Sequence, residues 1–277
     1  MNPLHIITLF FIYGCLGWCV EVAFAAVKER TFVNRGFLNG PICPIYGFGV
    51  LIVVLSLQNF KDQWFILFLA SAVLTSILEL LTGFLLDKLF HHRWWDYSDM
   101  PLNIGGYICP LFSLFWGVIC VIMIKFIHPP IQAVVVHIPN LILFIIDMVL
   151  WSAFVIDIYI TVTEIFKLNR RLKKMGEIAQ ELHAFSDQLG EGIYKNVMEQ
   201  MEKGTELMAD LEEKQEKIKA LKDKYQLLLD ENPLVGQRIL KAFPNMKSRL
   251  HSDELEELKT YLRQKLDLAK IKRKEKH

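Results

Sequence analysis

Two segments of the chain echo each other, Gly40-Pro41-Ile42-Cys43-Pro44-Ile45-Tyr46 and Gly106-Tyr107-Ile108-Cys109-Pro110-Leu111-Phe112. Each follows a polar loop that contains glycine, and each opens a long apolar run. An apolar run with one glutamate precedes each, Glu21 in the first case and Glu79 in the second. Irregular backbone and carboxylates are costly beside a membrane. This repeated unit of glutamate helix, polar loop and Cys-Pro helix is therefore the strongest functional signal in the chain.

Apolar and charged residues are divided between two parts of the 277-residue chain, of which 53% is hydrophobic. Residues 1–167 are apolar with few charges, whereas residues 168–277 are dense in Lys, Glu, Leu and Gln. The sequence therefore predicts an all-α protein with a transmembrane domain (1–167) and a cytoplasmic helical tail (168–277). A net charge of +1 argues against a nucleic-acid partner.

Five runs are long and apolar enough to cross a bilayer, which takes about 20 residues of helix. They cover residues 4–27, 42–60, 64–90, 104–127 and 138–166. The second is the shortest and begins among prolines, which suit the first turn of a helix because that turn needs no backbone N–H. We expect a polytopic bundle of five spans embedded in lipid.

Basic residues in the short loops predict the orientation, because they gather on the cytoplasmic side. The segments after the first, third and fifth runs hold Lys28, Arg30, Arg35, Lys88, Arg93, Lys167, Arg170, Arg171, Lys173 and Lys174. The alternate loops hold only Lys61 and Lys125. We therefore expect a cell-membrane protein with its N-terminus outside, its C-terminus in the cytoplasm and both repeated loops in the cytoplasm.

Acids within the apolar runs predict a polar pocket that faces the cytoplasm. Glu21 and Glu79 fall near the inner ends of their spans, and Asp147 falls nearer the middle of the membrane, with no Lys or Arg at that depth. Helix N-termini in the repeated loops would add partial positive charge. The candidate binding residues are Glu21, Asn34, Arg35, Gly40, Pro41, Cys43, Tyr46, Glu79, Asp96, Tyr97, Asn103, Cys109 and Asp147.

A structural role is the alternative for these acids. Glu21 and Glu79 would then cap the backbone N–H groups of the loops and pair with Arg35 and Arg93. The five cysteines show no metal-type C-x-x-C spacing and suit small apolar packing positions. We find no Walker phosphate-binding loop, H-E-x-x-H pair or G-x-S-x-G motif, and we predict no enzyme, cofactor or metal site.

Helical spacing of apolar residues continues through the tail. A coiled-coil seam is predicted at Leu207, Leu211, Ile218, Leu221, Tyr225 and Leu228, and it ends before Asn232-Pro233. Ser252 can cap a last helix, and residues 270–276 form a basic end. Three roles fit this pattern: dimerisation of the protein, an antiparallel hairpin within one chain, and recruitment of a cytoplasmic partner.

The repeated motifs resemble those of the CmpB-type ABC-transporter permeases, a family similar to the eukaryotic transmembrane protein 229 group. The resemblance rests on Gly17-Trp18 with Glu21, Asn34-Arg35-Gly36-Phe37-Leu38, Gly40-Pro41, Cys43-Pro44-Ile45-Tyr46-Gly47, Trp95-Asp96-Tyr97-Ser98, Gly106, Cys109 and Trp116-Gly117. It covers residues 5–165 and leaves the tail outside. It implies a permease component for an unidentified solute that would need a separate ATPase subunit. The alternative is a membrane-anchored scaffold whose tail binds a partner.

Overall fold

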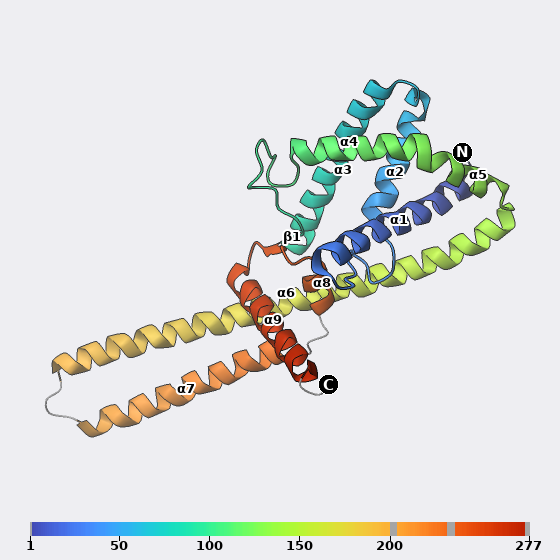
Figure 1. The fold of residues 1–277 in the computed structure, drawn as a ribbon. Helices are drawn as coiled ribbons and strands as arrows, with labels where there is room; N and C mark the ends of the chain where they lie inside the picture. The colour runs from blue at the N-terminus through green and yellow to red at the C-terminus, as the bar shows by residue number, and fades with distance from the viewer. Residues whose placement is uncertain (1, 200–203, 232–235, 275–277) are drawn as a thin grey trace. The chain divides into compact units, whose positions relative to one another are not determined.

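The computed structural model describes residues 2–199, 204–231 and 236–274, and within them the fold is almost wholly helical (Figure 1). This confirms the all-α prediction. Contacts divide the chain into two compact units. Unit 1 comprises residues 1–165 and 238–249, and unit 2 comprises residues 166–237 and 250–277. The sequence assigned all of 168–277 to the tail, whereas the structure groups 238–249 with the apolar helices.

The elements of the chain follow in this order: α1 (Pro3–Glu29), α2 (Pro44–Leu57), η1 (Gln58–Phe60), α3 (Trp64–Phe90), β1 (His92–Arg93), α4 (Pro110–Ile122), η2 (Met123–Ile127), α5 (His128–His137), α6 (Asn140–Glu199), α7 (Gly204–Asp230), α8 (Gln237–Ala242), β2 (Lys247–Ser248) and α9 (Ser252–Lys274).

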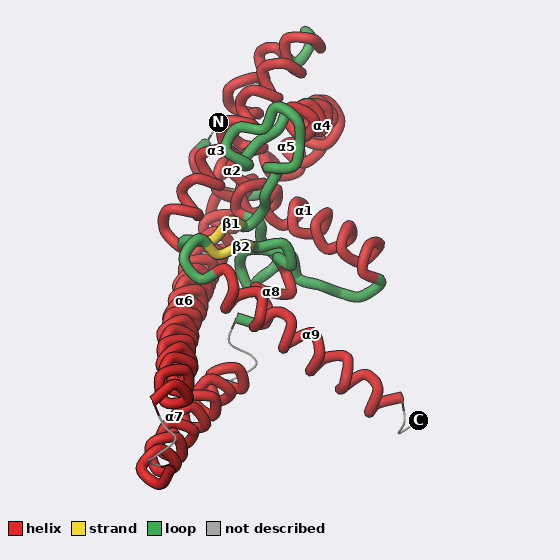
Figure 2. The backbone as a smooth tube through the Cα atoms, turned by 90° about the vertical axis from the view of Figure 1, so that its left-hand side faces the viewer, coloured by secondary structure: helices red, strands yellow, loops and turns green. Residues whose placement is uncertain are grey.

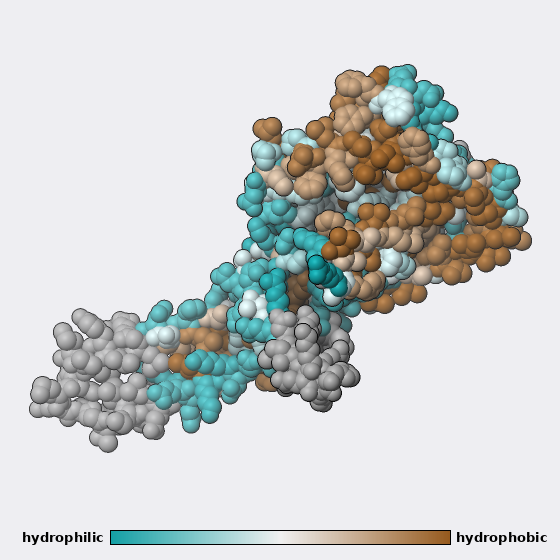
Figure 3. Space-filling model, in the orientation of Figure 1, coloured by the Kyte–Doolittle hydropathy of each residue, from teal (hydrophilic) through white to brown (hydrophobic). Residues whose placement is uncertain are grey.

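Four helical stretches in the described residues are long and apolar enough to cross a membrane: Pro3–Lys28, Trp64–Phe90, Pro110–His137 and Asn140–Asp187. Pro44–Phe60 is apolar but shorter, with a rise of about 25 Å against the roughly 30 Å of a hydrocarbon core. A count of five spans therefore stays a prediction. Hydrophobic side chains cover much of the surface of unit 1, whereas the described surface of unit 2 is mainly hydrophilic (Figure 3).

Proline starts the second helix of each repeat. Pro44 and Pro110 occupy the first turn of α2 and α4, and Cys43 and Cys109 precede them in extended backbone. The residue before a proline is disfavoured in the α region. The helices therefore start later than residues 42 and 104, where the predicted spans began.

The fourth predicted span ends too early at residue 127. The helix runs on from Pro110 to His137, through the π-turn η2 and the pair Pro129-Pro130. Proline cannot donate the usual helical hydrogen bond, and a π-turn absorbs that change in register. Lys125 is consequently helical rather than part of a loop, and its Nζ lies 3.6 Å from the centre of the Trp64 ring.

Two hydrophobic cores hold unit 1 together, and α2 contributes to both. The first core contains residues of α1, α2, α5 and α6, including Phe10, Leu51 and Phe154. The second joins α2, α3 and α4 through residues that include Val54 and Leu67. Other helices therefore cover α2 on two sides. This position accounts for the apolar sequence of α2.

Contacts show which helix ends and loops of unit 1 lie together. Asn2 donates a hydrogen bond to Asn140 at 3.2 Å, so α1 and α6 begin at the same end. Segment 238–249 contacts both repeated loops, which therefore lie together at one end of unit 1. Its strand β2 pairs with β1 in antiparallel fashion, with His92 opposite Ser248 (Figure 2).

Unit 2 contains the later part of α6, α7 and α9. Arg171 on α6 donates to the carbonyls of Leu228 and Leu229 at 2.7 and 2.9 Å, where α7 ends. This contact closes an antiparallel helical hairpin, one of the three predicted arrangements. Gly176 allows α9 to approach, since a Cβ there would lie 2.8 Å from Glu254 Oε1.

The coiled-coil prediction is only partly visible in unit 2. Leu221 is buried, and Ile218, Tyr225 and Leu228 are half-buried. The side chains of Leu207 and Leu211, and those of the basic end 270–276, lie outside the described residues. A coiled coil therefore stays a prediction.

Candidate functional site

The first repeat places a tyrosine against its glutamate. Tyr46, on the first turn of α2, donates from its phenol to Glu21 Oε1 at 2.6 Å. Arg35 lies on the other side of the carboxylate, with its Nε 3.7 Å from Oε2. Gly17 makes room for the phenol ring, because a Cβ there would lie 2.3 Å from Tyr46 Cγ. The charge of Glu21 thus has both a hydrogen bond and a cation.

The second repeat also places a tyrosine on its glutamate but provides no cation. Tyr97 donates to Glu79 Oε1 at 3.1 Å. Glu79 is 9% exposed, its Oε2 is buried, and no described residue donates a hydrogen bond to that oxygen. None of the ion pairs in the described residues involves Glu79. Phe112, which corresponds to Tyr46 in the repeat, stacks on Tyr97 with 4.7 Å between ring centres.

One face of α4 brings the two Tyr–Glu pairs together. Phe112 contacts Tyr97, and Trp116, one turn later, lies 5.7 Å from the Tyr46 ring. Burial raises the pKa of Tyr97 above its usual range, and the nearby groups Glu79, Cys109 and Glu21 raise it further. Both glutamates therefore act on the same phenol. The structure thus brings together these members of the predicted pocket: Glu21, Arg35, Cys43, Tyr46, Glu79, Tyr97 and Cys109.

Asp157 on α6 holds the first loop. Its carboxylate accepts from the backbone N–H of Asn39 at 3.0 Å and from that of Gly40 at 2.7 Å, and the Asn39 side chain donates to it as well. Asn34 accepts from Trp18 at 2.7 Å and donates to the Asn39 carbonyl. Asn34 and Gly40 therefore shape the loop. Asp157, outside the predicted set, supplies the capping that the sequence assigned to Glu21.

Arg238 is the second residue of the first loop's support that the sequence did not identify. Its guanidinium donates to the carbonyls of Gly36, Phe37 and Leu38 at 2.9 to 3.0 Å. Burial lowers the pKa of Arg238 from its usual value, an effect opposed by Glu164 and Asp157. More than 200 residues separate Arg238 from Gly36, and α8 carries no sequence signal for this contact.

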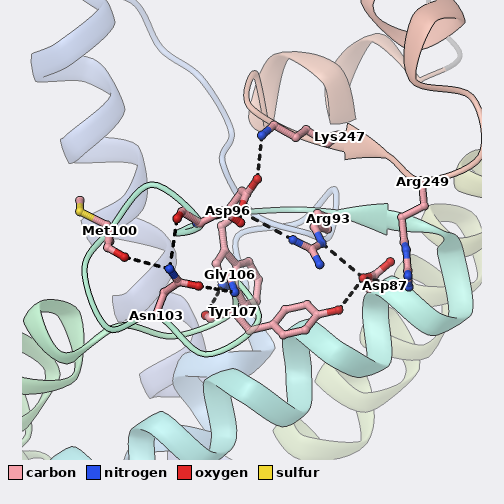
Figure 4. A network of polar contacts seen from close by, with 11 residues as sticks. Asp87, Arg93, Asp96, Met100, Asn103, Gly106, Tyr107, Lys247 and Arg249 are labelled. Atoms are coloured by element: carbon pink, nitrogen blue, oxygen red, sulfur yellow. Dashed lines mark hydrogen bonds and ion pairs between the residues drawn. The ribbon is translucent and has the colours of Figure 1, made fainter.

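The second loop contains its own polar network (Figure 4). Asp96 accepts from Lys247 at 2.7 Å and from Ser98, and Asn103 donates to the Met100 carbonyl while accepting from Gly106 N. Burial would raise the pKa of Asp96, but the bonds from Lys247 and Ser98 outweigh it and hold the pKa at about 2.

Arg93 belongs to this network as well. It pairs with Asp87 at 3.5 Å and with Asp96 at 3.8 Å, whereas the structural alternative paired it with Glu79. Tyr107 and Arg249 also contact the Asp87 carboxylate, so that buried acid has three partners.

The backbone of Cys43 has a structural role of its own, and the remaining predicted residues lie apart from the two glutamates. Cys43 is buried, and its N–H donates to the Gly14 carbonyl at 2.9 Å, which joins α1 to the start of α2. Pro41 is exposed. Asp147 is 3% exposed and accepts from Thr8, which precedes Glu21 on α1 by about 20 Å of helical rise. The structure does not bring Asp147 to Glu21 and Glu79.

Phenols, rather than backbone N–H groups, are the hydrogen-bond donors to both glutamates. Arg35 does pair with Glu21, as the structural alternative expected, but no described backbone N–H donates to Glu21 or Glu79. Among the described residues there is also no group of three or more His, Cys, Asp or Glu side chains that could hold a metal ion. The site thus consists of two carboxylates, two phenols and the aromatic rings of α4.

Apolar helices of membrane length around half-buried Glu21 and buried Glu79 define the class of protein, a membrane-embedded helix bundle. Residues 8–162 match the model of the CmpB family, described as "Putative ABC-transporter type IV". The match covers more than half of the chain, so the protein belongs to this family. Searches of curated proteins and of solved structures found no match. The likeness to the transmembrane protein 229 group stays a prediction.

Proposed function

We propose that the protein is the membrane component of a transporter and that the Tyr–Glu pairs of the two repeats form its solute site. The observation that carries this proposal is Glu79, whose carboxylate is buried with one oxygen unpartnered among the described residues. Keeping a buried carboxylate ionised without a cation costs several kcal/mol. Such groups inside membrane proteins mark substrate or ion pathways.

The proposed topology has five spans, the N-terminus outside and the C-terminus in the cytoplasm. The distribution of Lys and Arg supports it, and so does the position of both repeated loops at one end of unit 1. The sequence contains no Walker phosphate-binding loop, so ATP-driven transport would need a separate ATPase subunit.

Because the solute is unidentified, the test compares small-molecule contents rather than the flux of one compound. Cells that express the wild-type chain, Glu79→Gln or Glu21→Gln at equal membrane abundance are compared by untargeted mass spectrometry. We expect the wild-type chain to change the level of at least one solute and both variants to abolish that change. Asp147→Asn is the matched control. If cells with the wild-type chain match cells without it, the transport proposal is wrong.

A second candidate function is a membrane-anchored scaffold, favoured by the helical hairpin of unit 2. Removing all of 168–277 would confound the test, since it also removes Arg238 and Lys247. Residues Ile178, Glu181, Leu221 and Lys224 line one groove, so residues 182–220 can be replaced by a short linker. Loss of function with this shortened hairpin supports the scaffold, and retained function supports the transporter. Dimerisation through the tail is checked by the mass of the purified chain.

A further inference from the structure

The groups around the Tyr–Glu pairs leave one buried carboxyl group without a cation. Glu21 has Arg35 at 3.7 Å, whereas Glu79 has no cation among the described residues. Arg93, a basic residue of the second loop, forms its ion pairs with Asp87 and Asp96 instead. A bound cation would therefore supply the positive charge that an ionised Glu79 lacks.

Aromatic rings make up the rest of this site. Tyr46 and Tyr97 donate to the carboxylates, Phe112 stacks on Tyr97, and Trp116 packs against Tyr46 in a T-shaped arrangement. All four rings are half-buried, so the rings remain accessible while Glu79 is buried. Aromatic faces attract weakly hydrated cations such as substituted ammonium groups.

The same composition disfavours a metal ion. Ca²⁺ takes about six to eight oxygen ligands and Mg²⁺ about six, and no described group of three or more candidate side chains provides them. The carboxylates lie on α1 and α3, and the donors next to them are phenols. The neighbours of Glu79 are thus suited to a cation with an apolar body.

We propose that Glu79, together with Glu21 and the rings of Tyr46, Tyr97, Phe112 and Trp116, binds a monovalent organic cation. The carboxylate of Glu79 neutralises the charge, and the rings pack against its apolar substituents. This inference deepens the proposed transport function by naming the class of solute.

The test is binding to the purified full-length chain in detergent, with tetraphenylphosphonium as the probe and triphenylphosphine oxide as its neutral counterpart. Calorimetry should show saturable binding of one probe molecule per chain and none of the neutral compound. Glu79→Gln should weaken binding at least tenfold. Trp116→Ala should weaken it less, and Asp147→Asn, which removes a buried acid elsewhere, should leave it unchanged.

Three results would overturn the inference. They are the absence of saturable binding to the wild-type chain, equal binding by Glu79→Gln, and equal binding of the neutral compound. If Glu79→Gln does not fold, equal binding by wild type and Trp116→Ala overturns the role of the rings. A proton as the only ligand would appear as proton uptake without probe binding, which also overturns it.

Binding in detergent requires no transport. Probe binding without any change in cellular solutes would contradict the proposed function alone. If the level of an uncharged or anionic solute changes and no probe binds, the proposal of an organic cation is wrong, but the proposed transport function is not contradicted.

Discussion

The two repeats use the same pair of groups, a phenol and a glutamate, but they obtain the phenol from different places. In the first repeat Tyr46 comes from the following helix, and Gly17, four residues before Glu21, makes room for it. In the second repeat Phe112 occupies the position of Tyr46, and the phenol comes from Tyr97 in the loop. Thr75 lies four residues before Glu79, at the position equivalent to Gly17. A glycine is not required there, because the ring of Tyr97 comes from the loop rather than from the following helix.

Charge compensation separates the repeats further. Arg35 neutralises Glu21, whose side chain is 29% exposed, whereas Glu79 is buried without a cation. The difference teaches that two copies of one motif can keep the same phenol–carboxylate hydrogen bond and still differ in charge compensation. The following predictions test this difference.

Gly17→Ala should have the largest effect on stability. Its Cβ would lie 2.3 Å from Tyr46 Cγ, so α1 and α2 must separate. We expect a loss of about 3 kcal/mol, the upper part of the range for overpacking, measured as earlier aggregation on heating in detergent. Gly49→Ala is the control, because its Cβ meets only the flexible Leu78 side chain at 3.2 Å. Equal losses in both variants would contradict the special role of Gly17.

Arg238→Ala should destabilise the first loop and leave the second intact. Three carbonyls lose a charged donor. The expected loss is about 2 kcal/mol, and limited proteolysis should reach the chain near Arg35 sooner. Arg238→Lys should recover only part of this stability, since one ammonium cannot reproduce the planar set of donors. Accelerated cleavage in the second loop alone would show that the assignment is wrong.

Glu79→Gln and Glu21→Gln should shift thermal stability in opposite directions. An amide at position 79 removes a buried carboxyl group that has no cation, so we expect a gain of about 1 kcal/mol. An amide at position 21 removes the partner of Arg35, so we expect a small loss. Melting temperatures of the two purified variants provide the comparison. Shifts of the same sign would indicate that the two acids have equivalent roles.

Lys247→Ala should have the smallest effect, below about 1 kcal/mol, because the lysine is 62% exposed. The folded pKa of Asp96 is about 2, below its ordinary value of 3.8. The bond therefore stabilises the fold above about pH 4 and is lost as the pH falls toward 2. The difference in melting temperature between wild type and Lys247→Ala should shrink over that interval. In an Asp96→Asn background, Lys247→Ala should show no such pH dependence.

Local signals in the sequence predicted much of this molecule. The apolar runs predicted the helices, because apolar periodicity acts within a few residues, although α2 and α4 begin at Pro44 and Pro110 rather than at residues 42 and 104. Glu21 and Glu79 were singled out as acids within apolar runs, and each accepts a hydrogen bond from a tyrosine. Their role as a binding site stays a prediction. The continuation of helix through Pro129-Pro130 was missed, since the sequence alone gave no reason to expect the π-turn that accommodates them. Asp157 and Arg238 were missed for another reason. Each supports a loop more than 100 residues away, and only the folded chain brings the partners together.

Segment 238–249 gives the chain an unusual connectivity. The chain passes from unit 1 to unit 2 at residue 166, returns at 238 and leaves again at 250. Both ends of residues 166–237 are thus joined to unit 1. One end continues from the earlier part of α6, and the other leads into Arg238, β2 and Lys247, which contact the two repeated loops. If the chain is cleaved between α6 and α7, the two fragments should therefore copurify. The carboxyl-terminal fragment contains residues 238–249, which contact both repeated loops of unit 1.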